Sequence, residues 1–164
     1  MPAKPSGSPG FCQLSCLLQW QRSTHRGAAA YRVGSELHTS FDATLDSAPF
    51  TVSTTQPLVI TLTHDYDLDR APGDPLGFTG VARLFASLDD GASWFEMTRY
   101  AGTSNGWTTS TIDFGTGLGG STLRLRLQAT TSPSFTADPA FWAISRIEVQ
   151  GATPMFTRLV DDVN

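Results

Sequence analysis

Apolar and polar residues alternate along much of the chain. In the clearest run, residues 57–69, every second position is apolar apart from His64: Leu58, Ile60, Leu62, Tyr66 and Leu68. Threonine and aspartate fill most of the positions between them. This period of two predicts a half-buried strand with one face on the core, and His64 falls on that core-facing side. We expect His64 to be a hydrogen-bonded core histidine rather than a ligand or a base.

Further strands follow the same pattern. Residues 81–88 and 94–98 are joined by Asp89-Asp90-Gly91, and glycine supplies the positive φ that a hairpin turn needs. In residues 121–129 leucine alternates with arginine and glutamine, so Leu123, Leu125 and Leu127 are expected to face inward and Arg124, Arg126 and Gln128 outward. Other candidate strands are residues 35–41, 48–52, 107–114, 141–149 and 154–160.

No stretch combines helical periodicity with helix caps, so little or no helix is expected. Many strands separated by turn signals are typical of a sandwich, a jelly roll or a barrel. The sequence predicts an all-β antiparallel β-sandwich, a jelly roll of seven to nine strands. Residues 31–164 would form this single domain.

Residues 1–30 are interpreted as a leader or linker. They contain Cys12 and Cys16, and no cysteine follows, so neither a disulfide framework nor a thiolate metal site is expected in the domain. The apolar run FCQLSCLLQW, followed by AAA, resembles a signal peptide. Two glutamines interrupt the run and two arginines precede the small residues, which favours a linker instead.

Charge excludes some classes of partner. Charged residues make up 16% of the 164 residues and the net charge is −4, so a nucleic-acid partner is not expected. Lys4 is the single lysine, and the other basic residues are arginine. No apolar run approaches the roughly 20 residues of a membrane-spanning helix, so membrane insertion is not expected either.

Residues 102–106 contain a literal G-x-S-x-G, with Ser104 at its centre. In hydrolases this pattern places a nucleophile on a sharp turn between a strand and a helix. Here the residues that follow are Trp107 and a run of threonine and serine, which favour a strand. Asn105-Gly106 is a common hairpin dipeptide, and no histidine is tied to Ser104 by the flanking pattern. We interpret the segment as a turn and expect no catalytic residue and no enzyme.

Four aspartates lie at and after the end of the 57–69 run: Asp65, Asp67, Asp69 and Asp74. Carboxylates on one face repel each other unless solvent or a hard cation separates them, and Ca²⁺ prefers such oxygen ligands. They are the candidate ligands of a calcium site. The alternative is a solvated polar face at a strand end.

Aromatic residues supply the candidate binding surface. Most aromatic side chains of a β-sandwich lie in its core, and Trp94 is expected there. Tyr100 and Trp107 flank the turn at residues 101–106 and are the candidate ligand-binding residues.

Residues 47–151 resemble the jelly-roll modules of secreted bacterial metalloproteases of the immune-inhibitor type and the related MAM-type adhesion modules. The segments that carry the resemblance, in order, are SAPFTV, LVITLTHDYDLD, ASLDDGASWFEM, Gly106-Trp107, FGTGLGGSTLRLRLQA and FWAISRIEV. Ser145 stands where that family usually has an acidic residue, and Phe141 where glycine often precedes the tryptophan. If the acid helps to hold calcium in relatives, the calcium site is weakened here.

The resemblance implies a non-catalytic, extracellular binding or adhesion module of a larger exported bacterial protein, with a carbohydrate or protein ligand. The alternative is a structural module that self-associates or packs on a neighbouring domain of the same protein. Fold alone does not choose between them.

Overall fold

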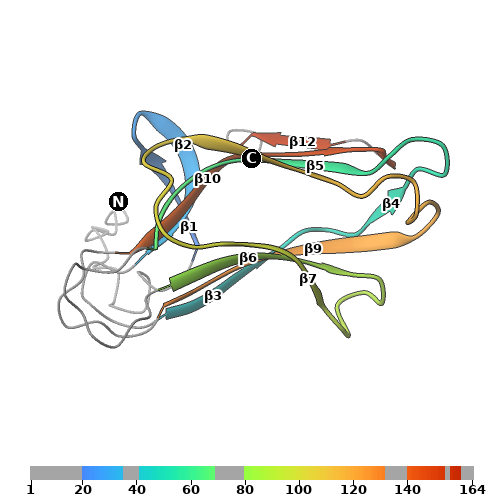
Figure 1. Ribbon diagram of the computed structural model, residues 1–164, viewed down its shortest axis with the longest axis horizontal. Helices are drawn as coiled ribbons and strands as arrows, with labels where there is room; N and C mark the ends of the chain where they lie inside the picture. The colour runs from blue at the N-terminus through green and yellow to red at the C-terminus, as the bar shows by residue number, and fades with distance from the viewer. Residues whose placement is uncertain (1–19, 35–40, 69–79, 132–139, 154–155, 160–164) are drawn as a thin grey trace, which may run out of the picture.

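The computed structural model describes residues 20–34, 41–68, 80–131, 140–153 and 156–159. Over these ranges the chain forms twelve strands and no helix. The strands make two antiparallel sheets that lie one above the other (Figure 1). The fold class expected from the sequence, an all-β antiparallel sandwich, is confirmed, with more strands than the seven to nine expected. Among the described residues, no helix is long and apolar enough to cross a membrane.

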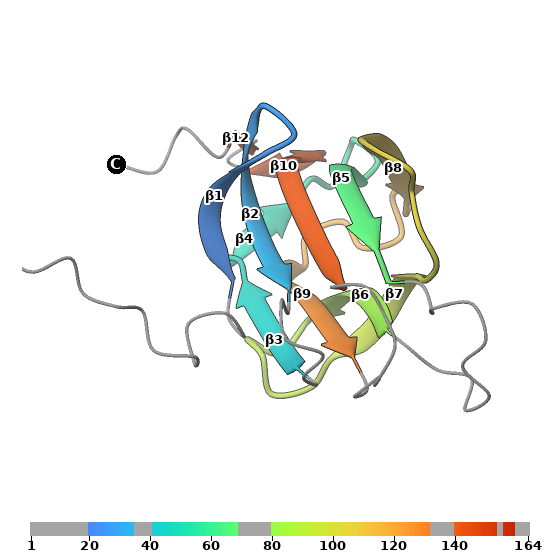
Figure 2. The same ribbon diagram turned by 90° about the vertical axis from the view of Figure 1, so that its left-hand side faces the viewer.

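The two sheets have six strands each. The first sheet has the order β1 (Gln21–His25), β2 (Ala28–Gly34), β10 (Phe141–Gln150), β5 (Val59–Asp67) and β8 (Thr108–Asp113), with β12 (Phe156–Leu159) also paired to β10. The second has the order β11 (Ala152–Thr153), β4 (Phe50–Val52), β9 (Thr122–Thr131), β6 (Gly80–Ser87) and β7 (Phe95–Tyr100), with β3 (Phe41–Asp46) also paired to β9. Figure 2 shows the strands of the first sheet from one end of the sandwich.

The core lies between the inward faces of the two sheets. From β5 it receives Ile60 and Leu62, and from β9 it receives Leu123, Leu125 and Leu127, all buried. The outward positions of β9 are Arg124, Arg126 and Gln128, as the alternation predicted. Apolar burial of this kind contributes roughly 25 cal/mol for each Å² removed from water, which makes the shared core the main source of stability.

The chain crosses between the sheets several times. Gly151 makes one crossing possible, from β10 in the first sheet to β11 in the second. Its φ is +72°, and a Cβ atom there would lie 2.1 Å from the carbonyl oxygen of Pro57. Any other residue would therefore clash with the backbone as well as strain its own conformation.

The first sheet begins earlier than the sequence indicated. β1 and β2 form a hairpin whose turn residues, Arg26 and Gly27, both have positive φ. β2 then pairs with β10 in the middle of the sheet. Residues 20–30, which the sequence assigned to a leader, thus belong to the domain, whereas residues 1–19 lie outside the described residues.

His64 is the polar group at the centre of the core. It is fully buried, and its Nδ1 accepts a hydrogen bond from the indole N–H of Trp142 at 3.0 Å. Because an indole only donates, the imidazole proton must lie on Nε2, which is 2.9 Å from the Ser110 hydroxyl. Burial lowers the pKa of His64 from 6.5 to about 4, although the charge of Asp65 acts in the opposite direction. The expected hydrogen-bonded core histidine is confirmed.

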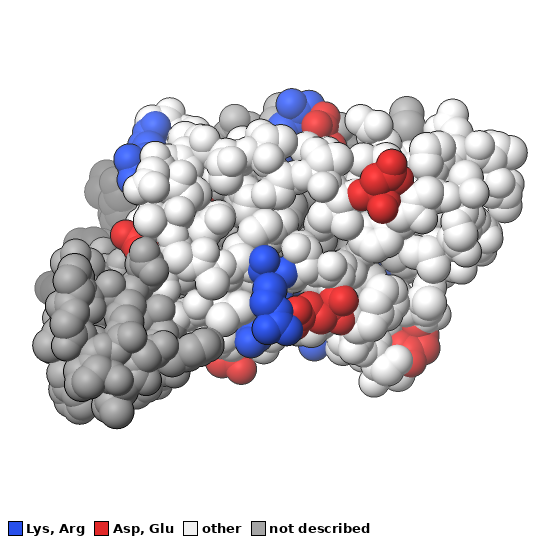
Figure 3. Space-filling view, in the orientation of Figure 1, with Lys and Arg blue, Asp and Glu red and all other residues white. Residues whose placement is uncertain are grey.

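Charged side chains are sparse on the surface. The face in Figure 3 is mostly uncharged, and its arginine and acidic atoms gather in small clusters, one of which lies over β7.

The neutral state of His64 predicts a pH dependence of stability. The pKa of the folded state, about 4, lies below the unfolded value of 6.5. Between these two values the unfolded state binds more protons, so stability is lost as the pH falls through this window. The loss in unfolding free energy should be about 2 kcal/mol between pH 7 and pH 5, measured by urea unfolding.

His64→Gln is the matched variant, because an amide can accept from Trp142 and donate to Ser110 without titrating. It should lose this contribution and keep only the pH dependence of the other groups. Equal slopes for the wild type and the variant would show that His64 does not titrate in this way.

Candidate functional site

The G-x-S-x-G segment is the connection that carries the chain from β7 in the second sheet to β8 in the first. The backbone N–H of Ser104 donates to the carbonyl of Tyr66 at 2.9 Å. Its hydroxyl accepts from the backbone N–H of Tyr66 at 2.9 Å and donates to Oδ1 of Asp65 at 2.8 Å. β8 begins at Thr108, so a strand and not a helix follows the serine. Ser104 therefore fastens the crossover to the end of β5.

Asp65, which accepts this hydrogen bond from Ser104, is buried. Its side chain is 1% exposed, and Oδ2 lies 2.8 Å from Nε2 of His25 and 2.6 Å from Nε of Arg26. Burial by itself would raise the pKa of the Asp65 carboxyl, but the hydrogen bonds from Ser104 and His25 and the charge of Arg26 outweigh it and lower the pKa. Asp65 is thus an anion that protein donors satisfy on both oxygens.

The order of these three side chains differs from that of a hydrolytic triad. In a triad the imidazole lies between the hydroxyl and the carboxylate, because it must take the proton of the serine. Here the carboxylate of Asp65 lies between Ser104 and His25. The serine hydroxyl therefore donates to an acceptor that holds it in place, and this arrangement does not generate a nucleophile.

The four aspartates of the candidate calcium site have different positions. Asp65 faces outward from the sheet, as the alternation required, but the β1–β2 hairpin covers it. A calcium ion at Asp65 would have to displace Arg26 and His25. Asp67 is half-buried at the end of β5, and Asp69 and Asp74 lie outside the described residues. The described part of the chain contains no group of three or more potential metal-binding side chains, and the calcium site stays a prediction.

The side chains of Tyr100 and Trp107, the candidate ligand-binding residues, lie on opposite sides of the first sheet. The ring of Tyr100 lies 4.5 Å from that of His64 and 6.1 Å from that of Trp142, on the core side. Trp107 precedes Thr108, which pairs with His64, so alternation directs its ring to the outer face. There its centroid lies 5.5 Å from the ring of His25. The structure does not bring these two side chains together into one platform.

A larger polar surface lies on the outer face of the second sheet. Cross-strand register places Asp46, Arg126, Phe85 and Glu96 in one row across β3, β9, β6 and β7. The next row is Thr44, Gln128, Arg83 and Arg99. We call these two rows, together with Asp42 and Trp94, the polar platform.

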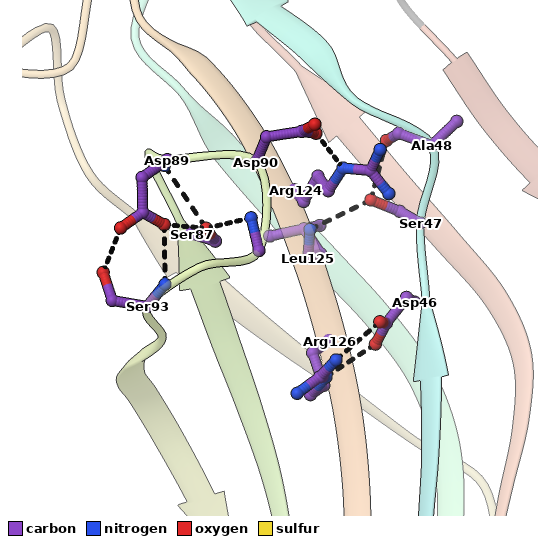
Figure 4. Close-up of polar contacts among 11 residues, drawn as sticks. Asp46, Ser47, Ala48, Ser87, Asp89, Asp90, Ser93, Arg124, Leu125 and Arg126 are labelled. Carbon is purple, nitrogen blue, oxygen red and sulfur yellow. Dashed lines mark hydrogen bonds and ion pairs between the residues drawn. The ribbon is translucent and has the colours of Figure 1, made fainter.

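Side chains of the platform hold one another in place. Nε and Nη2 of Arg126 each lie 2.7 Å from one carboxylate oxygen of Asp46, and the guanidinium lies 4.0 Å from the centre of the Trp94 ring (Figure 4 shows the Arg126–Asp46 pair). The amide of Gln128 donates to Asp42 at 2.8 Å. The two hydrogen bonds between Arg126 and Asp46 fix the orientation as well as the distance of the pair, so the platform presents these planar groups in a defined direction.

Glu96 joins the other two arginines of the platform. Its carboxylate oxygens lie 2.6 Å from Nε of Arg99 and 3.3 Å from Nε of Arg83. Each positive charge of the platform therefore has an acidic neighbour, and the surface carries no strong net field.

The β6–β7 turn positions Trp94. Oδ1 of Asp89 accepts from the Ser87 hydroxyl and the Ser93 backbone N–H, both at 2.8 Å, and Oδ2 accepts from the Ser93 hydroxyl at 2.5 Å (Figure 4). The hydrogen bonds from Ser93 and Ser87 lower the pKa of Asp89 to about 2. Gly91 has a φ of +93°, and a Cβ atom there would lie 3.3 Å from the Trp94 ring. Asp89 is a turn residue, as the sequence predicted, whereas Trp94 is half-buried on the outer face rather than in the core.

Sequence alone identified only the β9 residues of the platform. The alternation in residues 121–129 identified Arg124, Arg126 and Gln128 as outward-facing. The acidic partners of Arg126 and Gln128, which are Asp46 and Asp42, come from β3, and 80 positions separate Asp46 from Arg126 in the chain. The alternation showed which residues of each strand face outward, but it did not show which strands pair with each other.

The chain matches no protein-family model and no curated protein. Among solved structures it is similar to TmCBM61 in complex with beta-1,4-galactotriose, with a TM-score of 0.39 and 11% identity over 82% of this chain and 73% of that one. It is also similar to a structure of infectious bursal disease virus Gt strain, with a TM-score of 0.34 and 12% identity over 88% of this chain. This chain spans about a third of that viral chain, 34%. At these scores neither likeness bears on what this chain binds.

The contacts of Ser104 predict a structural role that mutation can separate from a catalytic one. Ser104→Ala leaves the Tyr66 N–H and one Asp65 oxygen without their partner, which should cost about 2 kcal/mol of unfolding free energy. Thr103→Ala is the control, because its exposed hydroxyl only accepts from the N–H of Asn105 at 3.2 Å, and it should cost less than about 0.5 kcal/mol. Equal stabilities of the two variants in urea unfolding would show that Ser104 does not stabilise the connection between the crossover and β5.

Proposed function

We propose that this protein is a non-catalytic binding module that holds a neutral carbohydrate on the polar platform. The observation that carries the proposal is the Asp46–Arg126–Trp94 arrangement, in which a fixed carboxylate–guanidinium pair lies against an indole ring. Neighbouring sugar hydroxyls both donate and accept hydrogen bonds. A carboxylate beside a guanidinium offers acceptors and donors side by side.

Charge balance on the platform favours a neutral ligand. Arg83 and Arg99 lie against Glu96, Arg126 lies against Asp46, and Asp42 accepts from Gln128, so a polyanion would meet three carboxylates beside the three guanidinium groups. The charge-assisted contacts that hold phosphate backbones need unpaired basic groups instead. A polyhydroxylated ligand without charge gains from both members of each pair.

Aromatic groups add the apolar part of the surface. Trp94 stands at the edge of the platform, and Phe85 lies between Arg126 and Glu96 in the same row. The C–H groups on one side of a sugar ring are apolar and pack on such rings, while the hydroxyls reach the polar side chains around them.

Protein binding by a flat apolar patch fits this surface less well. Among the described residues the exposed large hydrophobic side chains are Leu88, 49% exposed, and Phe95, 41% exposed. Interfaces that bind proteins stably have an apolar centre with aromatic anchors. The outer face of the second sheet has a network of paired charges in place of such an apolar centre.

We further propose that the module belongs to a larger exported bacterial protein and is related to the metalloprotease-associated and MAM-type modules. What supports this is the S-x-D-x-G-x-x-W hairpin, in which Ser87, Asp89 and Gly91 form the turn that precedes Trp94. Ser145, which replaces the acidic residue of those modules, donates to the carbonyl of Thr63 at 3.3 Å, beside the irregularity in β10.

Screening on an array of neutral and acidic oligosaccharides tests the proposal. The wild type should retain neutral glycans. Arg126→Ala, which removes the pair with Asp46 and the contact with Trp94, should weaken binding at least about tenfold, or about 1.4 kcal/mol. Gln128→Ala should weaken it by a smaller factor. Isothermal titration on the best glycan gives the affinities.

Thr109→Ala is the matched control, because Thr109 is an exposed residue of β8 in the other sheet and should bind like the wild type. Thermal melts show whether each variant is folded. Retention of acidic glycans alone, or equal binding by Arg126→Ala and Thr109→Ala, would refute the platform as the site.

A further inference from the structure

β8 forms one edge of the first sheet, where its only strand partner among the described residues is β5. An edge strand presents backbone N–H and C=O groups that another strand can pair with, and proteins usually block this with charged residues, proline or bulges. Three other edge strands carry charged residues: Arg22 in β1, Asp42 and Asp46 in β3, and Glu96 and Arg99 in β7. A further edge strand, β11, has only two residues, too few to pair with much of another strand.

β8 lacks this protection. Its sequence is TTSTID, with neither lysine, arginine nor proline, and Asp113 at one end is its single charged residue. Figure 3 shows several small charged clusters on this face of the molecule, one of which lies over β7. The strand therefore has the composition of one that accepts a partner.

Alternation identifies the backbone groups that face the open edge. The N–H of Phe114 donates to the carbonyl of Leu58 at 2.9 Å, so the backbone hydrogen-bonding groups of Phe114 are directed toward the β5 side. Successive residues of a strand direct their hydrogen-bonding groups to opposite sides. The N–H and C=O groups of Thr109, Thr111 and Asp113 therefore point away from β5. The side chains of the same three residues are exposed on the outer face.

We propose that two copies of this chain pair through β8 in an antiparallel arrangement, with the twofold axis at Thr111. In this register Thr111 lies opposite Thr111 of the second copy, and Thr109 lies opposite its Asp113. All three outward-directed residues form ladder hydrogen bonds. Each carboxylate faces a hydroxyl rather than the other carboxylate, so like charges are not opposed.

The register also suits the inner face. Ser110 of one copy lies opposite Ile112 of the other, so neither position places a charge at the junction. The contact is isologous and closes on itself, which gives a dimer and not a filament. Because β8 belongs to the first sheet, the polar platform on the second sheet stays open in both copies.

Thr111→Pro tests the pairing directly. Proline removes the N–H that points to the open edge, and an outward-facing edge position tolerates it within the monomer. Sedimentation velocity should give twice the chain mass for the wild type and the monomer mass for Thr111→Pro. Thr111→Val, which keeps the N–H and a β-branched side chain, should remain a dimer. A thermal melt confirms that Thr111→Pro is folded.

A cysteine at the axis tests the register. Hydrogen-bonded antiparallel partners have Cα atoms about 5.5 Å apart, within the range of about 4.4–6.8 Å that a disulfide spans. Thr111→Cys, in a Cys12→Ser and Cys16→Ser background, should oxidise to a covalent dimer, whereas exposed Thr54→Cys should not. A monomeric wild type at every concentration, a Thr111→Pro dimer, or equal cross-linking at both sites would overturn the proposal.

Discussion

The buried carboxylate of Asp65 connects three parts of the chain that are far apart in sequence. The β1–β2 hairpin supplies His25 and Arg26, the β7–β8 crossover supplies Ser104, and β5 supplies the carboxylate itself. An ionised carboxylate removed from water costs several kcal/mol unless donors surround it. The donors of both the hairpin and the crossover are therefore needed to stabilise the buried charge, so these two segments are coupled through Asp65.

A second fixed point operates on the opposite face. The β6–β7 turn is held by Asp89, and the Trp94 ring lies close to Gly91 and against the guanidinium of Arg126. Arg126 in turn takes both oxygens of Asp46 on β3. A local turn is thereby linked across the sheet to a strand far away in sequence. The pairing of Arg126 with Asp46 and of Gln128 with Asp42 restrains these side chains before a ligand arrives, which lowers the entropy cost of ordering them on binding.

How much of this the sequence could predict depends on the range of each contact. Period-two alternation correctly assigned the faces of β5 and β9 and placed His64 in the core, because parity is a local property. It could not show what covers an outward face. Asp65 looked solvated because the hairpin that buries it resembled a linker, with arginines beside small residues. Trp94 looked like core because its partner, Arg126, is a contact between distant strands.

The preference for arginine over lysine follows from these same contacts. The chain has one lysine, Lys4, against ten arginines, and composition alone gave no reason for this. In the structure Arg26, Arg99 and Arg124 each pair with a carboxylate through Nε. Arg126 also uses a second nitrogen while its flat face lies on an indole ring. Lysine has no Nε–H, no planar fork and no flat face, so it would keep the charge and lose the geometry. This protein has few charged residues, and most of those described form directional pairs. The same residues therefore both form the platform and place charges on the edge strands of the sheets.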